Sequence, residues 1–167
     1  MTAAPATHSQ DEAAIRLSLN LQDEAATAAL ARRLAGVAER GDVFALQGDL
    51  GCGKTAFARA FINALPGAQE EVPSPTFTLA QLYPRGDAEV WHFDLYRLER
   101  PEDAVELGLD EALSDGICLI EWPERLGRGL PRSALTLSFS FGAAPEARRI
   151  EISGGTAWQR RLAELRA

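Results

Sequence analysis

Eight consecutive residues, Gly48 to Thr55, read GDLGCGKT and match the pattern GxxxxGK[ST]. Glycines allow the backbone to bend tightly around a polyphosphate, and successive amide N–H groups then point inward as an anion cradle. In this pattern the ammonium of Lys54 lies beside the β- and γ-phosphates, and the hydroxyl of Thr55 can bind Mg²⁺. We therefore predict a nucleoside triphosphate site formed by Gly48, Asp49, Leu50, Gly51, Cys52, Gly53, Lys54 and Thr55.

The chain uses lysine at one position only. It has 17 lysine and arginine residues, and Lys54 is the one lysine among them. A rigid, planar guanidinium would not replace a compact ammonium among phosphates, so this choice supports a phosphate-binding role for Lys54. The same count argues against a GTPase. The guanine-reading motif NKxD needs a lysine outside the phosphate-binding loop (P-loop) at Gly48–Thr55, and the chain has none.

Hydrolysis of a bound triphosphate also needs a carboxylate that organises Mg²⁺ and water. Two strand-end residues fit this role: Asp94, which follows Val90–Phe93, and Glu121, which follows Ile117–Ile120. The run before Glu121 is unbroken and apolar, as expected for a central parallel strand beside the strand that precedes Gly48. The run before Asp94 alternates, as in a half-exposed hairpin strand. We predict Glu121 on the Mg²⁺ side and Asp94 as a supporting or water-positioning group, both catalytic together with Lys54. An ordinary strand-end carboxylate remains the alternative at each position.

Other polar side chains near these acids have simpler explanations. Thr76 and Thr78 lie in a proline-rich loop, where a hydroxyl could reach the γ-phosphate or its Mg²⁺. Ordinary turn chemistry also explains such a loop, and for the loop alone we favour it. His92 shares a strand face with Asp94 and is predicted to be structural, whereas Arg97 could pair with Asp94 or contact a phosphate.

The elements around the glycine-rich motif must place it between a strand and a helix. Val43–Leu46 is a short apolar run typical of a buried strand, and Ala56–Leu65 is a helix-forming run. The N-terminus of that helix would face the phosphates with its positive dipole end. Upstream, Ile15–Leu19 alternates like a strand, and a helix is expected from an N-cap at Asp23 to Gly41.

The middle of the chain predicts a β-hairpin inserted after the motif helix. Its first half lies within Glu71–Leu82, its turn at Tyr83–Asp87 and its returning strand at Glu89–Leu95. Short helical segments are expected at Pro101–Gly108 and Asp110–Leu113.

The last third of the chain adds one buried strand and a second hairpin. Gly116–Ile120 is continuous and apolar, whereas Ala134–Phe141 and Arg148–Ser153 alternate. An amphipathic helix with Trp158, Leu162 and Leu165 on its apolar face would follow. Because strands and helices interleave, the predicted class is α/β with additional antiparallel strands.

The composition fits one globular domain. With 167 residues, 46% apolar and 25% charged, the chain can bury a core, and no apolar run is long enough to span a membrane. Residues 1–12 are small and polar, so we predict a disordered leader and not a signal peptide, followed by one domain at 13–167. Cys52 and Cys118 indicate no disulfide framework, which favours a reducing cytoplasm.

The chain is acidic, with a formal net charge of −7 and a pI of about 4.9. Such a surface repels phosphate backbones. Independent binding of DNA or tRNA is therefore not expected, and any link to nucleic acid would pass through a partner protein.

Four blocks together resemble the TsaE family, also called YjeE: GDLGCGKT at 48–55, SPTFTL at 74–79, HFDLYRL at 92–98 and IEWPE at 120–124. The P-loop alone is generic, but HxDxYR followed by EWP is far more specific, and the blocks fit the family over roughly residues 15–140. The resemblance implies a P-loop NTPase-like three-layer fold with a mixed, mainly parallel sheet and added antiparallel hairpins.

The resemblance to TsaE also implies a function. TsaE proteins bind ATP and Mg²⁺, hydrolyse ATP slowly, and act with a TsaB–TsaD pair. TsaD transfers threonylcarbamoyl to adenosine 37 of tRNA. The chain would then be an accessory ATPase that supports repeated turnover of TsaB–TsaD and meets tRNA only indirectly.

The same resemblance implies roles for particular residues by motif position. Thr55 and Glu121 fall on the Mg²⁺ side, and Asp94 is the essential acid of HxDxYR. Thr76 falls in a switch-like loop, and Glu24, at the start of the first helix, on the adenine side.

Position 52 departs from the family, in which alanine is usual there. A thiol at a helix N-terminus beside Lys54 can have a lowered pKa, which predicts sensitivity to oxidants or alkylation. That sensitivity is a hypothesis, and we favour the simpler alternative that Cys52 is a small residue tolerated at this place.

Two other functions would use the same nucleotide site. A small P-loop kinase would need an arginine-rich lid, for which Arg125, Arg128 and Arg132 are the only cluster. A nucleotide-gated protein interaction module would bind ATP with the same residues and hydrolyse it incidentally.

Overall fold

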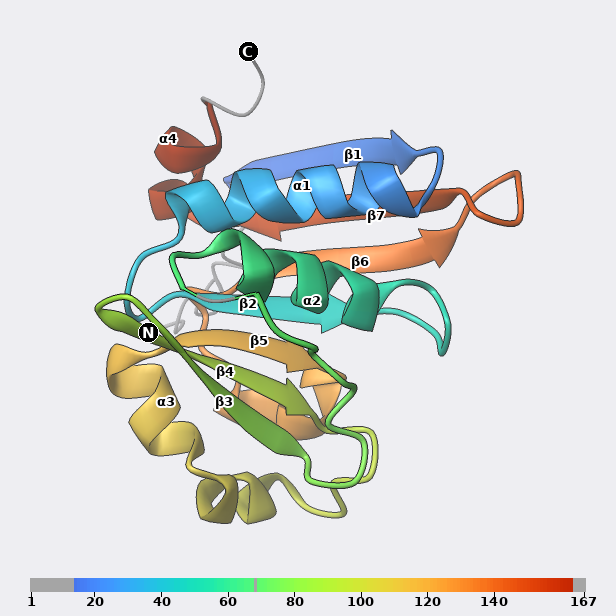
Figure 1. Ribbon diagram of the computed structural model, residues 1–167. Coiled ribbons are helices and arrows are strands. Elements are labelled where there is room, and N and C mark those ends of the chain that lie inside the picture. The colour runs from blue at the N-terminus through green and yellow to red at the C-terminus, as the bar shows by residue number, and fades with distance from the viewer. Residues whose placement is uncertain (1–13, 68, 164–167) are drawn as a thin grey trace, which may run out of the picture.

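The computed structural model describes residues 14–67 and 69–163. Within these residues, seven strands form one sheet that lies between two layers of helices (Figure 1). The order of the strands across the sheet is β1-β7-β6-β2-β5-β4-β3. The strands are β1 (Ile15–Leu21), β2 (Val43–Gln47), β3 (Ala80–Arg85), β4 (Ala88–Asp94), β5 (Ile117–Glu121), β6 (Leu135–Phe141) and β7 (Arg148–Gly154).

The centre of the sheet is parallel and its flanks are antiparallel. Strands β6, β2, β5 and β4 run side by side in one direction. On one flank β7 returns antiparallel to β6 and β1 pairs antiparallel with β7, and on the other flank β3 pairs antiparallel with β4. The predicted α/β fold, with a mixed sheet that is parallel in its centre and carries two antiparallel hairpins, is therefore confirmed.

Helices cover both faces of the sheet. One face carries α1 (Glu24–Val37), α2 (Lys54–Ala64) and α4 (Thr156–Ala163). The other face carries two 3₁₀ helices, η1 (Pro101–Leu107) and η2 (Pro123–Gly129), and the helix α3 (Leu109–Asp115). Among the described residues, no helix has both the length and the apolar character that crossing a membrane requires.

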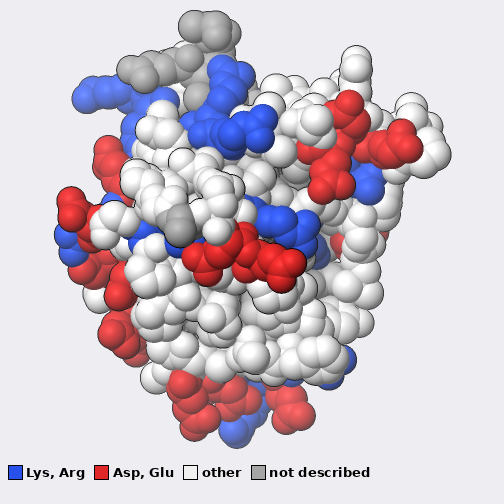
Figure 2. All heavy atoms as spheres, in the orientation of Figure 1, with Lys and Arg blue, Asp and Glu red and all other residues white. Residues whose placement is uncertain are grey.

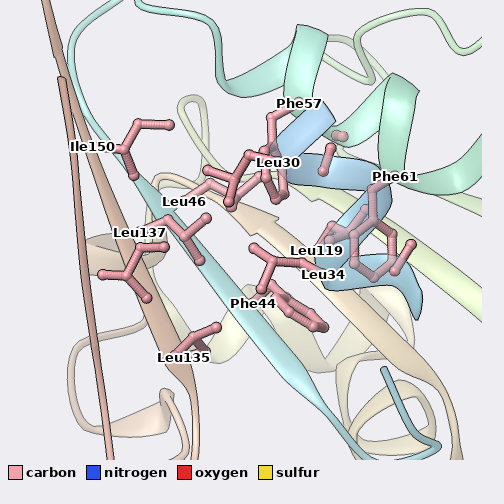
Figure 3. Close-up of a cluster of buried hydrophobic side chains, with 14 of the residues drawn as sticks. Leu30, Leu34, Phe44, Leu46, Phe57, Phe61, Leu119, Leu135, Leu137 and Ile150 are labelled. Atoms are coloured by element: carbon pink, nitrogen blue, oxygen red, sulfur yellow. The ribbon is translucent and has the colours of Figure 1, made fainter. Parts of the chain in front are cut away.

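The larger buried cluster lies between the sheet and helices α1 and α2 (Figure 3). Phe44 of β2 meets Phe61 of α2 with ring centroids 4.9 Å apart, and Phe57 meets Phe139 at 5.7 Å. Burying each of these rings contributes roughly 1.5–3 kcal/mol. A second cluster, which includes Phe93, joins the opposite face of the sheet to η1, α3 and η2. The two clusters fix the strand ends between rigid layers.

The helix α1 begins at a side-chain cap. The carboxylate of Asp23 accepts a hydrogen bond from the N–H of Ala26 at 2.8 Å, as its predicted N-cap role requires. The helix ends at Val37, because Ala38 is already extended. The expected end at Gly41 was therefore too late; Gly41, with a φ of 92°, belongs to the connection to β2.

The β3–β4 hairpin turns over Gly86 and Asp87, and the expected turn at Tyr83–Asp87 was too long. The strand β3 instead continues through Arg85 and includes Pro84. A proline is compatible with this strand because β3 forms the edge of the sheet and pairs on one side only. Gly86 has a φ of 57°, which suits a two-residue turn.

Strand β4 is an inner strand, where a half-exposed hairpin strand was expected. It pairs in parallel with β5, and Val90, His92, Phe93 and Asp94 are buried. The prediction failed because η1 and α3 cover the face that carries Phe93 and its stacked neighbour Trp91. Alternation in sequence therefore did not mean exposure to water.

The remaining differences from expectation are smaller. The segment Pro101–Leu107 is 3₁₀ helix, α3 extends to Asp115 beyond the expected Asp110–Leu113, and η2 was not predicted. The expected leader at residues 1–12 and the apolar position Leu165 lie outside the described residues.

Candidate functional site

The loop between β2 and α2 has a backbone that only glycine allows at its first position. Gly48 has a φ of 141°, and a Cβ there would lie 2.6 Å from the carbonyl oxygen of Phe139 and 2.7 Å from Sγ of Cys52. At the other end, Gly53 has a φ of 103° and is followed directly by α2, which begins at Lys54. The helix N-terminus thus stands at the end of the loop, as an anion site requires.

A pocket of about 320 Å³ opens beside this loop, at the C-terminal ends of β4 and β5. In open α/β sheets, ligands bind outside the carboxyl ends of the strands. The lining comes from the loop, the start of α1, the two strand ends and the segments before β3 and β7. It consists of Glu24, Thr27, Leu50, Gly51, Gly53, Lys54, Thr55, Ala56, Ser74, Thr76, Asp94, Glu121, Trp122, Glu146 and Arg148.

The pocket brings together most of the residues predicted from the sequence. Three predicted residues of the loop, Gly48, Asp49 and Cys52, do not line it. Thr78 lies apart, in a separate hollow with Phe77 and Gln81. The predicted residues that do line it are Glu24, Leu50, Gly51, Gly53, Lys54, Thr55, Thr76, Asp94 and Glu121.

The ammonium of Lys54 is held at the pocket wall. Lys54 is only 4% exposed. Its Nζ donates a hydrogen bond to the carbonyl of Gly48 and lies 3.6 Å from the centroid of the Trp122 ring. Both contacts favour a cation, and neither neutralises it. The positive charge is therefore retained inside the pocket.

The carboxylate of Glu121 is held from both sides. Its Oε1 accepts from the hydroxyl of Thr55 at 2.9 Å, and its Oε2 lies 2.6 Å from Nε2 of His92. Glu121 is 2% exposed, and a carboxylate removed from water needs such partners. An ionised carboxylate only accepts, so Nε2 of His92 carries the hydrogen and donates it. The other ring nitrogen, Nδ1, is buried and has no hydrogen-bond partner among the described residues.

Asp94 stands beside Glu121 as its register partner on the neighbouring strand. Its Oδ1 accepts from the N–H of Tyr96 at 3.1 Å. Its Oδ2 lies 3.3 Å from the hydroxyl of Ser74 and 3.4 Å from that of Thr76. These two hydroxyls are 2.7 Å apart and one donates to the other, so one hydroxyl hydrogen is left for Asp94. Turn chemistry alone is therefore an incomplete description of the loop before β3, because its hydroxyls reach a carboxylate on another segment.

Two strained backbone positions adjoin the two acids. Among the described residues, Leu79 (φ 64°) and Trp122 (φ 59°) are the non-glycine residues with positive φ. The carbonyl of Leu79 accepts from the N–H of Asp94 at 2.9 Å, and Trp122 directly follows Glu121. Such conformations cost on the order of 1–3 kcal/mol and persist only where surrounding contacts impose them. The strain is thus concentrated at the pocket.

The arginines considered for other roles do not line the pocket. The guanidinium of Arg97 lies 4.6 Å from the ring centroid of Phe77. None of Arg125, Arg128 and Arg132 contributes to the pocket wall. These three residues therefore do not form a kinase-like lid in this conformation.

Both cysteines are free thiols, as predicted, and both are fully buried. Burial raises the pKa of the Cys52 thiol, and the nearby charge of Lys54 opposes this only in part. Burial also raises the pKa of Cys118 to about 12. The lowered pKa considered for Cys52 is therefore not found, because desolvation outweighs the lysine.

The donor set suits Mg²⁺ bound together with a nucleotide. In the described part of the chain, no group of three or more His, Cys, Asp or Glu residues is arranged to hold a metal ion. Mg²⁺ in phosphate-binding loops takes few protein ligands, because phosphate and water supply the others. The hydroxyl of Thr55 and the carboxylate of Glu121 are donors of the right type and are neighbours. The residues present are therefore suited to binding Mg²⁺ together with a nucleotide.

The sequence did not identify part of the pocket wall: Thr27, Ala56, Ser74, Trp122, Glu146 and Arg148. Ser74 and Trp122 belong to the blocks SPTFTL and IEWPE, so a signal for them was present. Glu146 and Arg148 come from the far end of the β6–β7 hairpin, and nothing in their local sequence indicates a nucleotide loop.

Comparison with known proteins identifies similar chains. The model of a family described as threonylcarbamoyl adenosine biosynthesis protein TsaE matches residues 21–150. The tRNA threonylcarbamoyladenosine biosynthesis protein TsaE of Treponema pallidum is 41% identical over 123 residues, which cover 73% of this chain and 87% of that protein. The protein of the same name from Rickettsia felis is 44% identical over 106 residues, or 64% of this chain. That match spans 62% of the Rickettsia protein, which is less than two thirds of its length.

A solved structure also shares the fold. The crystal structure of Bacillus subtilis YdiB superposes with a TM-score of 0.76 at 32% sequence identity. The superposition covers 90% of this chain and 94% of YdiB.

Proposed function

Because this chain belongs to the TsaE family, we propose that it is an accessory ATPase in the formation of threonylcarbamoyladenosine in tRNA. It would bind ATP with Mg²⁺ and hydrolyse ATP slowly, and this would support repeated turnover of a TsaB–TsaD complex. The proposal is supported by the names of the relatives and by the chemistry of the pocket.

The phosphates would be held by the loop amides and Lys54. The glycine backbone of the loop and the retained positive charge of Lys54 support this assignment. Thr55 and Glu121 would hold Mg²⁺, which neutralises phosphate charge when bound. His92 keeps the carboxylate of Glu121 in place through its Nε2–H.

Asp94 would orient the attacking water. Its carboxylate accepts from the N–H of Tyr96 and contacts the hydrogen-bonded pair of hydroxyls of Ser74 and Thr76. A carboxylate held in this way can accept a hydrogen bond from water without reorganising. The observation that carries the proposal is the register of β4 and β5, which brings Asp94 and Glu121 together at the end of the sheet that faces the P-loop.

Protein partners, and not tRNA itself, are the expected binding partners. The net charge is −7, and a chain of net negative charge repels a phosphate backbone. On the face drawn in Figure 2, several basic side chains gather near the top, while acidic side chains lie at the right, across the middle and at the lower edge. We therefore propose that the chain meets tRNA only through TsaB–TsaD, in the cytoplasm, where free thiols such as Cys52 and Cys118 are usual.

Phosphate release from ATP tests the proposal, measured with and without purified TsaB–TsaD. The variants Glu121→Gln and Asp94→Asn keep the size of each side chain and remove its charge. Glu151→Gln, on an exposed position of β7, is the matched control. We expect release that TsaB–TsaD stimulates, reduced on the order of 100-fold in the two pocket variants and unchanged in the control.

Release that is absent in the wild type, or unchanged in both pocket variants, would contradict the ATPase proposal. A nucleotide-gated interaction module is then the second candidate. Phe77 is 82% exposed and follows Thr76 in the loop that contacts Asp94. A movement of Asp94 on nucleotide binding would therefore also move an exposed side chain. The affinity for TsaB–TsaD, measured with ATP, with ADP and without nucleotide, separates the two functions. Only an interaction module requires that this affinity depend on the bound nucleotide.

A further inference from the structure

Arg148, the first residue of β7, reaches the carbonyls of the nucleotide loop from the pocket wall. Its Nε donates to the carbonyl of Cys52 at 3.1 Å, and its Nη2 donates to the carbonyl of Gly51 at 3.3 Å. Its Nη1 donates to the carbonyls of Pro145 and Ala147, each at 2.8 Å. One guanidinium therefore joins two consecutive carbonyls of the loop to two carbonyls of the β6–β7 turn.

The direction of these bonds matters for anion binding. A loop that turns its amide N–H groups toward a phosphate must turn carbonyls away from it, and those carbonyls then need donors. In this loop the carbonyls of Gly51 and Cys52 have their donor in Arg148, and the N–H of Cys52 donates to the carbonyl of Asp49 at 3.3 Å. A guanidinium has five N–H groups in a fixed fork, so it can fix several acceptors at once.

The hydrogen bonds also define what Arg148 does not do. Four of its donor contacts go to backbone carbonyls, and these use its Nε, its Nη1 and its Nη2. A guanidinium occupied in this way has little capacity left to bind a phosphate directly. Its place in the pocket wall is therefore explained by the loop that it holds.

We propose that Arg148 is a positioning residue that holds the P-loop in its anion-binding shape before nucleotide arrives. The proposal rests on the proposed nucleotide site, since it assigns Arg148 a role in preparing that site. Preorganisation of this kind increases affinity for every ligand that uses the loop, because less ordering remains to be done on binding. ATP and ADP should therefore depend on Arg148 equally.

The test compares Arg148→Lys with Arg149→Lys. Lysine keeps the charge but cannot reproduce the planar fork. Arg149 is the adjacent residue on β7, and the partner of its guanidinium among residues 14–67 and 69–163 is the exposed Glu151, at 3.4 Å. Both variants thus make the same chemical change, and only one of them removes the bridge to the loop.

The first readout is modification of Cys52 by a thiol reagent in nucleotide-free protein. Cys52 is fully buried beneath the loop, and its carbonyl is one of the acceptors of Arg148. Cys118 is equally buried but lies in the other cluster, so it reports global opening. We expect Arg148→Lys to speed modification of Cys52 about tenfold. Cys118 should be unaffected in that variant, and neither thiol should change in Arg149→Lys.

The second readout is nucleotide affinity. Arg148→Lys should lower the affinity for ATP and the affinity for ADP by the same factor, about tenfold, whereas Arg149→Lys should change neither affinity. Loss of ATP affinity alone would show direct contact with the γ-phosphate and overturn the proposal. Unchanged modification of Cys52 would overturn it as well.

Equal acceleration at Cys52 and Cys118 would show general destabilisation, which also contradicts a specific role. Arg148→Gln, which keeps an amide donor, serves as a second variant if the lysine variant does not fold. A wild-type protein that binds no ATP would count against the proposed function. The Cys52 readout would still decide whether Arg148 holds the loop, because it needs no nucleotide.

Discussion

The P-loop and the pair of strand-end acids serve one pocket but are built in opposite ways. The loop is eight consecutive residues, and its shape depends on the left-handed backbone of its own glycines. Asp94 and Glu121 are far apart in the chain and become neighbours only through the register of β4 and β5. One region is thus specified locally, and the other by the packing of the whole sheet.

This difference determines which substitutions disrupt each region. A local loop is destroyed by one side chain that its backbone cannot accommodate. An assembled pair tolerates changes in shape but depends on the partners that orient each carboxylate, such as His92 for Glu121. Substitutions in the loop should therefore act on nucleotide binding, and substitutions around the acids on hydrolysis.

The largest effect is expected from Gly48→Ala. The new Cβ would overlap the carbonyl of Phe139, at a φ of 141° that L-residues rarely adopt. We expect the free energy of unfolding to fall by about 2–4 kcal/mol, measured by urea denaturation. ATP affinity, measured by calorimetry, should fall by a factor on the order of 100, because the loop must change shape.

The matched control for this change is Gly36→Ala in α1. A Cβ at Gly36 meets nothing within 4 Å. Alanine is favoured over glycine in a helix, so the free energy of unfolding should rise by about 0.5 kcal/mol with unchanged ATP affinity. Normal ATP affinity in Gly48→Ala would show that nucleotide binding does not depend on the conformation of this loop.

A smaller effect, on the acid region, is expected from His92→Phe. The change leaves Oε2 of Glu121 buried without its donor, which costs about 1–3 kcal/mol of stability. ATP hydrolysis should fall roughly tenfold, while ATP affinity without Mg²⁺ stays unchanged. The variant His92→Gln offers an amide donor and should recover part of the rate; a rate no better than that of the phenylalanine variant would contradict the positioning role.

The same contrast explains what the sequence predicts. The strand, loop and helix around Gly48 follow from residues that are consecutive, so their order and type were predicted and the helix start was missed by two residues. The continuous run Ile117–Ile120 also identified β5 as an inner strand paired with β2. Local patterns of this kind need no knowledge of the rest of the fold.

The part of the site that was missed depends on distant segments. Strand β4 alternates in sequence, but its Trp91 packs against Gly108 and Gly116, whose missing side chains leave room for the ring. No local sequence pattern in β4 indicates that η1 and α3 cover this face of the strand. Arg148 is similar, because its role depends on a loop almost a hundred residues earlier in the chain. Both contacts are products of topology.

A still smaller effect is expected where the loop before β3 meets the acid region. The hydroxyls of Ser74 and Thr76 lie 3.3 and 3.4 Å from Asp94, which is long for a hydrogen bond between oxygens. The double variant Ser74→Ala with Thr76→Val should lower ATP hydrolysis about fivefold, which corresponds to about 1 kcal/mol. Thr78→Val, outside the pocket, is the control and should leave the rate unchanged. A larger loss in the control would show that loop shape, and not the contact with Asp94, sets the rate.

The last effect is absent at neutral pH and separates the two buried thiols. Burial raises the pKa of Cys118 on β5 to about 12, whereas an unfolded thiol ionises near about 8.5. The stabilising contribution of Cys118 is therefore complete below about pH 8.5 and is lost as the pH rises toward the folded pKa. Between about pH 9 and pH 10, the wild type should lose about 1 kcal/mol more unfolding free energy than Cys118→Ala. Cys52→Ala should remove less of this slope, because Lys54 opposes the effect of burial at that thiol. Equal slopes for the wild type and Cys118→Ala in urea denaturation would show that the fold does not suppress ionisation of Cys118.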